Sequence, residues 1–311
     1  MKIKNVFRII LYPFVLLRRR YWQYLMHNNP KKWVEVLYKL SFGRPMNWNN
    51  PKEMNEKQRW IQFNSKMAQY MWPILADKYA VREYIEEKGL STILVKLYGR
   101  WTNADDIDFS KLPNKFVLKT NHGCGEIMVV KDKSLIDQRS IKEKFNQYLH
   151  TPYGYEAGEY HYLKIKPCII AEELLEEDSG FSTSLIDYKF YVFHGKPEAC
   201  AVFFNRELGS HNVEYCLYDM DWNCIENTKL HRFDNQGPMI PRPKCLLQMI
   251  EICRILAEQI PFVRLDFYEV KGQLYFGEFT FTPSGLNSAS SVYQYDRMLR
   301  WGSLMDLSKV E

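Results

Sequence analysis

The segment that decides the fold is residues 262–285, FVRLDFYEVKGQLYFGEFTFTPSG. Apolar and polar side chains alternate on both sides of Lys271-Gly272. Alternation with a period of two is typical of half-buried β-strands, and a short break containing glycine is typical of a hairpin turn. The segment therefore predicts a β-hairpin.

The two faces of this hairpin differ in chemistry, because successive side chains of a strand point to opposite faces. In the first strand, alternation separates Val263, Leu265 and Phe267 from Arg264, Asp266 and Tyr268. In the second strand, it places Phe276, Glu278 and Thr280 opposite Tyr275, Gly277, Phe279 and Phe281. One face is therefore expected to carry an arginine and two acids.

The register of the hairpin decides whether the two acids meet. A loop with an odd number of residues, for example residues 271–273, puts Asp266 directly across from Glu278. Carboxylates about 5 Å apart repel each other unless a cation lies between them. Mg²⁺ prefers one or two carboxylates together with phosphate oxygens, and Arg264 would stabilise a transferring phosphoryl group. The alternative is a surface hairpin, and a two-residue loop would put the acids on opposite faces.

Composition indicates a globular chain that does not bind nucleic acid. The 311 residues are 46% hydrophobic and 15% aromatic, with a net charge of +5. Eight basic residues and no acid precede Glu35, which leaves 34 basic and 37 acidic residues in the rest of the chain. Such a body lacks the basic surface of a nucleic-acid-binding protein.

The cysteines and histidines form no metal-binding pattern. The seven cysteines include no CxxC pair, and the seven histidines form no HExxH pattern. An odd cysteine count in a chain of this size indicates buried thiols in a reducing compartment. We therefore expect a cytoplasmic protein.

The N-terminal segment, residues 1–30, combines a short apolar run with basic residues. Residues 9–17, IILYPFVLL, lie between Arg8 and Arg18-Arg19-Arg20. This run is shorter than the roughly 20 residues that span a bilayer, and no small-residue cleavage site follows it. It predicts an interfacial anchor on the anionic inner face of the cell membrane. The alternative is a helix packed on the body with a solvated basic end.

Several helices and strands are expected between the N-terminus and residue 115. Pro51 at the first helical position predicts a mostly polar helix over residues 52–62. A second helix is expected over residues 77–88, ended by Gly89, and a strand over residues 92–98.

A glycine-containing turn joins two further predicted strands. Residues 116–120, FVLKT, and 126–130 flank the loop Asn121-His122-Gly123-Cys124-Gly125. Met128 replaces the third glycine of GxGxxG, and no Walker A pattern occurs in the chain. The amides of such a loop can cover phosphates, with Lys119 as a point charge. The alternative is an ordinary hairpin with a snorkelling lysine.

The remaining segments predict a second set of strands and one helix. Residues 167–175, PCIIAEELL, read as a strand buried on both faces. Residues 187–193 and 198–204 read as paired strands, with Asp187, Lys189 and Tyr191 on one face. Residues 243–260 predict a helix that packs on the core through its apolar stripe.

In this order, the segments resemble the ATP-grasp superfamily and, within it, the TupA-like group associated with teichuronopeptide and capsule polysaccharide biosynthesis. The resemblance covers roughly residues 35–300 and rests on DKYAVREYI (77–85), KFVLKTNHGCG (115–125), IIAEELL (169–175), DYKFYVFHGKP (187–197) and RLDFYEVKGQLYFGEFTFTPSG (264–285). It implies an α+β, ATP-grasp fold in which two lobes with antiparallel sheets clamp ATP. We expect a helical and α/β region at residues 31–115 as a candidate acceptor-binding region, the nucleotide-binding and catalytic lobes at 116–300, and a tail at 301–311.

The resemblance also implies roles for individual residues. Lys78 and Lys119 would contact ATP phosphates, and the loop with His122, Gly123, Cys124 and Gly125 would fold over them. Backbone groups near Glu172, Glu173 and Leu174 would meet the adenine, and Asp187, with Lys189 beside it, would meet the ribose. Asp266 and Glu278 would hold Mg²⁺, and Arg264 would steady the phosphoryl group. Thr280 occupies the place of the usual asparagine metal ligand, which puts a second metal position in doubt.

The function implied is an ATP-dependent carboxylate–amine ligase that works through an acyl phosphate. The expected partners are an amine or amino acid and a carboxylate, such as a uronic acid, on a carbohydrate or lipid-linked glycan acceptor. The alternatives are a glycosyltransferase or sugar kinase of capsule or O-antigen synthesis, and a non-catalytic assembly factor. A glycosyltransferase commonly uses a DxD-like motif, and we interpret Asp219-Met220-Asp221 as a hairpin turn instead.

Overall fold

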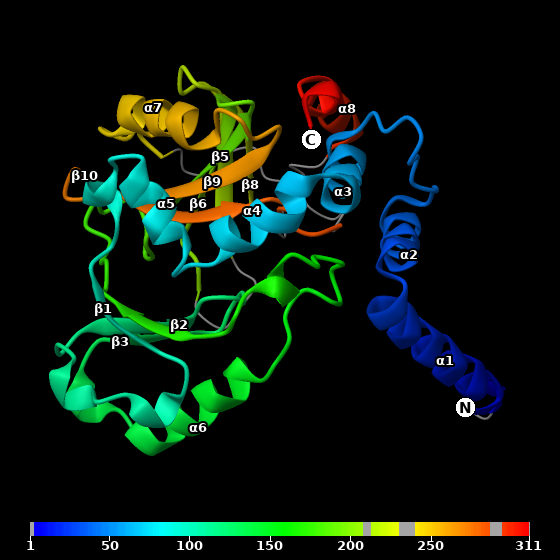
Figure 1. Cartoon of the computed structure of the whole chain (residues 1–311), viewed down its shortest axis with the longest axis horizontal. Helices are drawn as coiled ribbons and strands as arrows, with labels where there is room; N and C mark the ends of the chain where they lie inside the picture. The colour runs from blue at the N-terminus through cyan, green and yellow to red at the C-terminus, as the bar shows by residue number, and fades with distance from the viewer. Residues whose placement is uncertain (1–2, 208–212, 230–239, 287–293, 311) are drawn as a thin grey trace.

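The computed structural model describes residues 3–207, 213–229, 240–286 and 294–310 (Figure 1). The helices of this part are α1 (Ile3–Asn28), α2 (Pro30–Phe42), α3 (Met54–Asn64), α4 (Lys66–Ala76), α5 (Val81–Glu87), α6 (Gln138–Leu149), α7 (Leu246–Ala257) and α8 (Tyr295–Ser303). The strands are β1 (Leu97–Trp101), β2 (Phe116–Thr120), β3 (Ile127–Val130), β4 (Ile169–Glu172), β5 (Asp187–Phe193), β6 (Lys196–Phe204), β7 (Glu214–Tyr218), β8 (Cys224–Lys229), β9 (Val263–Val270) and β10 (Gln273–Thr280).

The larger sheet has six antiparallel strands in the order β10-β9-β5-β6-β7-β8. Helix α7 packs on β5, β6 and β9, and Figure 1 shows it along one face of this sheet. Phe190, Leu265 and Phe267 are fully buried in the core there. Because side chains alternate along a strand, their polar neighbours in β5 and β9 point to the opposite face.

The smaller sheet has four antiparallel strands in the order β1-β4-β2-β3. Its apolar face is covered by α6, whose Ile141 and Phe145 share a core cluster with Phe116 and Leu118. All four residues of β4 are buried, as the near-continuous apolar run 167–175 predicted. Lys119 lies on the other face of this sheet, since it follows the buried Leu118.

Helices from both ends of the chain complete the larger core. Trp72 of α4 stacks on Phe281 with ring centroids 4.6 Å apart, and Trp301 of α8 stacks on Tyr191 at the same separation. Trp301 and Met305 are fully buried. Trp301 and Met305, which lie in the segment expected as a tail, therefore contribute to the core.

The hairpin of β9 and β10 has the predicted strands and turns at Lys271-Gly272, as predicted. Its turn is the two-residue pair Lys271-Gly272, both with positive φ, and Val270 pairs with Gln273. A two-residue loop followed by regular pairing would put Asp266 opposite Gly277. A β-bulge between Phe276 and Glu278 shifts the register by one, so Glu278 pairs with Asp266. The inference that a two-residue loop would put the acids on opposite faces was therefore wrong, because the bulge restores their pairing.

The bulge also changes the faces of β10. Phe276 pairs with Phe267 and is buried in the core, whereas Glu278 pairs with Asp266 and Thr280 pairs with Arg264. The prediction that Phe276 shares a face with Glu278 was therefore wrong, because simple alternation does not hold across an inserted residue.

Three predicted boundaries before residue 100 were wrong. The helix expected from Pro51 begins at Met54, where Glu53 and Glu56 form a capping box. The helix expected at 77–88 begins at Val81, after a turn in which Asp77 accepts the backbone amides of Tyr79 and Ala80. The strand expected at 92–98 begins at Leu97.

Helix α1 extends away from the two sheets (Figure 1). Its C-terminal part joins the body, where Leu25 is buried and the Trp22 and Trp33 rings lie 5.9 Å apart. Leu17 and Tyr24 are exposed. None of the helices in the part of the chain described above is long and apolar enough to cross a membrane.

Candidate active site

Asp266 lies at the centre of a group of charged side chains on the polar face of the larger sheet. Arg264 donates from Nε to Asp266 Oδ1 and from Nη2 to Asp266 Oδ2, both at 2.7 Å. Lys189, the β5 partner of Asp266, donates to Oδ2 at 2.5 Å. Asp266 is 1% exposed. Burial raises its pKa, while Arg264 and Lys189 oppose this effect by stabilising the ionised form.

Glu278 faces the same cations and is more accessible. Its Oε1 accepts hydrogen bonds from Arg264 Nη2 at 3.0 Å and from Thr280 Oγ1 at 3.2 Å. Its side chain is 34% exposed. Desolvation raises its pKa, but the charges of Lys78, Arg264 and Lys189 outweigh that effect and lower the pKa of Glu278 to about 2. Glu278 is therefore an ionised carboxylate at the edge of the site.

Lys78 connects the glycine-containing loop to these acids. Its Nζ donates to the Gly123 carbonyl at 2.8 Å, and its backbone amide donates to the Asn121 carbonyl at 3.2 Å. Its charge also acts on Glu278. The structure thus brings Lys78 into contact with the loop and close enough to Glu278 for its charge to act there.

The loop itself is held by Glu126, which accepts a hydrogen bond from Thr120. A Cβ at Gly123 would meet the carboxylate of Glu126, so a larger residue there would require the Glu126 side chain to move. Cys124 and Gly125 are exposed at the tip of the loop, whereas His122 is buried and its Nε2 lies 3.4 Å from the Thr151 carbonyl.

Lys119, expected at the phosphates, is paired with an acid in this structure. Its Nζ lies 2.5 Å from Glu172 Oε2, and Glu172 Oε1 lies 3.4 Å from Arg82 Nη1. Of the groups expected near the adenine, the Glu173 amide donates to the Lys96 carbonyl at 2.9 Å. Glu173 is exposed and Leu174 is half-buried, both directly after β4.

Asp187, expected at the ribose, lies at the start of β5 beside two residues that sequence reasoning missed. Arg206 Nη2 donates to Asp187 Oδ2 at 3.1 Å, and Tyr268 forms a side-chain hydrogen bond with Asp187. Lys189 Nζ lies 3.6 Å from Asp187 Oδ2. The sequence contained a signal for Tyr268, because alternation places it on the same face of β9 as Asp266. It contained no signal for Arg206, whose contact with Asp187 depends on the pairing of β5 with β6.

The donor set suits Mg²⁺. Asp266 and Glu278 are opposed across two strands with a cation, the Arg264 guanidinium, between them. Thr280 Oγ1 is within 3.0 Å of Arg264 Nη2 on the same face. Two carboxylates and a hydroxyl leave coordination positions for phosphate oxygens, the arrangement that Mg²⁺ takes in nucleotide sites. A bound ion would supply charge neutralisation at the transferring phosphoryl group.

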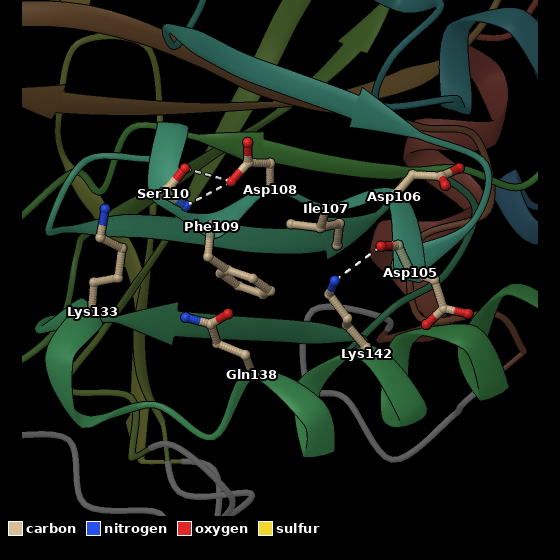
Figure 2. A pocket seen from close by; sticks show the side chains of 9 residues that line it. All are labelled: Asp105, Asp106, Ile107, Asp108, Phe109, Ser110, Lys133, Gln138 and Lys142. Carbon is tan, nitrogen blue, oxygen red and sulfur yellow. Dashed lines mark hydrogen bonds between the residues drawn. The ribbon is translucent and has the colours of Figure 1, made fainter.

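Two open pockets lie away from these residues. Figure 2 shows the pocket lined by η2 (Ala104–Asp106), η3 (Phe109–Lys111) and the start of α6, where Lys142 donates to the Asp105 carbonyl at 2.9 Å. It lies on the α6 side of the smaller sheet, opposite the face that carries Lys119. The other is lined by His194, Lys196 and the exposed side of α7. Neither pocket contains a residue assigned to the nucleotide.

Comparisons with known proteins agree with this architecture. A family model described as TupA-like ATPgrasp matches residues 56–303. Among solved structures, the chain is similar to a D-alanine–D-alanine ligase from Bacillus anthracis, with TM-score 0.44, 15% identity, and coverage of 76% of this chain and 68% of that chain.

A second similar structure is an L-amino acid ligase from Bacillus licheniformis, with TM-score 0.42, 12% identity, and coverage of 90% of this chain and 61% of that chain. A comparison with curated protein sequences found no match. The family model covers most of the chain, including both sheets and the hairpin with Asp266 and Glu278. The chain therefore has the ATP-grasp fold and belongs to the TupA-like ATP-grasp family.

Proposed function

We propose that this ATP-grasp ligase activates a carboxylate with ATP and Mg²⁺ and joins the resulting acyl phosphate to an amine. The observation that carries the proposal is the pairing of Asp266 with Glu278 across β9 and β10, with Arg264 bound to both acids and Lys189 bound to Asp266. Phosphoryl transfer between two anions needs cations and donors held in line more than it needs a base. This face of the sheet supplies them.

Each residue has a defined part in this reaction. Asp266 and Glu278 hold Mg²⁺, with Thr280 as the weaker third oxygen donor. Lys78 and the loop of His122, Gly123, Cys124 and Gly125 bind the β- and γ-phosphates, and Arg264 stabilises the charge on the transferring phosphoryl group. These roles are supported by the proximity of Lys78 both to Gly123 and to Glu278.

The other end of the nucleotide would lie between the two sheets. Asp187 and Lys189 bind the ribose side, and backbone groups near Glu172, Glu173 and Leu174 meet the adenine. Lys119 would exchange its ion pair with Glu172 for a phosphate oxygen when ATP binds. The ion pair between Lys119 and Glu172, at 2.5 Å, supports this role by holding the lysine beside β4.

We propose a uronic acid of a cell-surface polysaccharide, or of its lipid-linked precursor, as the carboxylate substrate. The family is associated with polysaccharide biosynthesis, and helix α1 supports a membrane-proximal acceptor. Arg18, Arg19 and Arg20 lie beside the exposed Leu17 and Tyr24 on this helix. Basic side chains next to apolar and aromatic ones favour the interface of an anionic membrane. The protein would then act in the cytoplasm, peripherally on the inner face of the cell membrane.

The test is to incubate the protein with MgATP, a uronic acid and hydroxylamine. A ligase forms a hydroxamate and releases ADP and phosphate. A sugar kinase forms ADP without free phosphate, and a non-catalytic assembly factor forms neither. The absence of hydroxamate with D-glucuronate and UDP-glucuronate, together with ADP release without phosphate, would favour the kinase and contradict the ligase.

A further inference from the structure

Glu159 is a buried carboxylate beside the proposed catalytic residues. It lies in the segment between α6 and β4 and is 5% exposed. Thr282, two residues beyond β10, donates its hydroxyl to Glu159 Oε1. Tyr153 forms a side-chain hydrogen bond with Glu159. Two hydroxyl groups therefore fix the position of this carboxylate. Because an ionised carboxylate accepts about four hydrogen bonds, roughly two of its acceptor sites remain.

No cation is paired with Glu159 in the described part of the chain. The nearest candidate, Arg59, donates instead to the carbonyls of Gly158 at 2.8 Å and Ala157 at 3.1 Å and to Gln62 Oε1 at 2.8 Å. Burial raises the pKa of Glu159 above its ordinary value, although Arg59, Thr282 and Arg264 act in the opposite direction. A buried carboxylate without a directly paired cation is costly, because it has lost water and no ion pair replaces it.

Glu159 faces the end of the site where the phosphoryl group is transferred. The charges of Arg264 and Glu278 act on it. Tyr153, its hydrogen-bond partner, is influenced by Glu278 and by Cys124 of the glycine-containing loop as well as by Glu159. Thr282, which donates to Glu159, lies two residues beyond Thr280, the last residue of β10, so the carboxylate is near the end of the strand that carries Glu278.

We propose that Glu159, held by Tyr153 and Thr282, binds the ammonium group of the amine co-substrate. This inference rests on the proposed ligase function and adds the residue that recognises its second substrate. An ammonium group brings the missing positive charge and three donors. The hydroxyls of Tyr153 and Thr282 leave the remaining lone pairs of the carboxylate for it. Mg²⁺ is a poorer fit at this position, because it needs several hard oxygen ligands and here would meet one carboxylate.

The experiment compares a neutral nucleophile with a charged one. Glu159→Gln keeps the size of the side chain and removes its charge. Glu156→Gln, an exposed glutamate on the same segment, is the matched control. Each variant is assayed with MgATP and D-glucuronate or UDP-glucuronate, using hydroxylamine, which is uncharged at neutral pH, or glycine, whose amine is protonated.

For Glu159→Gln we expect hydroxamate formation at the wild-type rate and a KM for glycine raised by about 30-fold or more, as when one partner of a buried charge pair is removed. Glu156→Gln should match the wild type with both nucleophiles. Equal loss of both products in Glu159→Gln, or no change in either, overturns the proposal.

Two further outcomes are decisive. If the wild type itself forms no hydroxamate, the ligase function is wrong, and the role of Glu159 is overturned with it. If Glu159→Gln does not fold, Thr282→Val is used, which removes one of the hydroxyls that hold the carboxylate. It should raise the KM for glycine and leave hydroxamate formation unchanged, and an unchanged KM contradicts the proposal.

Discussion

Gly277 lies against the backbone of Asp266, and this contact sets the register of the two acids. A Cβ on Gly277 would lie 2.9 Å from the Asp266 carbonyl oxygen and 3.1 Å from Tyr268 Cε2. Gly277 is the residue inserted between the Phe276 and Glu278 register positions. Without this bulge, the two-residue turn would pair Asp266 with Gly277 and direct Glu278 to the other face.

We therefore predict that Gly277→Ala abolishes Mg²⁺-dependent ADP formation. The added methyl group forces the bulge to shift, at a cost of about 1–3 kcal/mol in the free energy of unfolding. Gly89→Ala is the control. Gly89 has a positive φ, 74°, but a Cβ there would have nothing within 4 Å. This substitution should cost about 1–2 kcal/mol of stability and keep full activity. Equal activity in the two variants would show that the bulge does not position Glu278.

The two acids should respond differently to neutralisation. Asp266→Asn removes a charge that Arg264 and Lys189 both contact in a buried site, so it should lower the free energy of unfolding by about 3 kcal/mol or more. Glu278→Gln removes a charge that Lys78, Arg264 and Lys189 attract, and it should lower the urea midpoint by less than Asp266→Asn does, because the Glu278 side chain is 34% exposed. Both should lose Mg²⁺-dependent turnover, measured as ADP release.

Glu87→Gln, at an exposed position of α5, is the control for both variants and should change neither quantity. Retained turnover in Asp266→Asn or in Glu278→Gln would contradict the metal-binding role of that residue.

The low pKa of Glu278 predicts a pH dependence of stability. A carboxyl group whose pKa falls from 4.5 to about 2 on folding stabilises the folded state above pH 4.5. That contribution is lost as the pH falls from about 5 toward 2, because protonation removes the attraction to Lys78, Arg264 and Lys189. The difference in urea midpoint between wild type and Glu278→Gln should therefore shrink over this range. A difference that is constant from pH 7 to pH 3 would exclude the charge effect.

The arginines of α1 predict binding to anionic vesicles. Replacing Arg18, Arg19 and Arg20 by alanine should weaken binding to phosphatidylserine-containing vesicles by roughly 100-fold, since each basic residue contributes about 1 kcal/mol near such a surface. Replacing three exposed body residues, Lys66, Lys88 and Lys131, by alanine is the control for net charge. Vesicle sedimentation measures both. If the triple arginine variant binds as the wild type does, or the wild type does not bind, the membrane assignment is wrong.

Much of the fold could be predicted from local pattern. The strand over residues 116–120, the strand over 187–193 and the Lys271-Gly272 turn have the bounds that alternation and turn chemistry indicate. Asp219-Met220-Asp221 forms the predicted turn between β7 and β8, in which Asp219 Oδ1 accepts the amide of Asn223 at 2.7 Å. These features depend on residues close in sequence.

The rest of the site depends on contacts that local pattern does not contain. The bulge at Gly277 is an exception. A glycine inside a strand is compatible with a bulge, and the apolar positions change from Leu274 and Phe276 to Phe279 across it, which simple alternation over the whole strand overlooks. Glu159 and Thr282 are 123 residues apart in sequence. The ion pair between Lys119 and Glu172 likewise requires the antiparallel pairing of β2 with β4.

The most direct test of the account is a crystal structure of the protein with Mn²⁺ and a non-hydrolysable ATP analogue, in which the anomalous signal locates the metal. We predict a peak at coordination distance, about 2.0–2.3 Å, from oxygens of both Asp266 and Glu278 and in contact with the β- and γ-phosphates. A metal bound through phosphates alone, or an analogue bound away from these two side chains, would contradict the central claim.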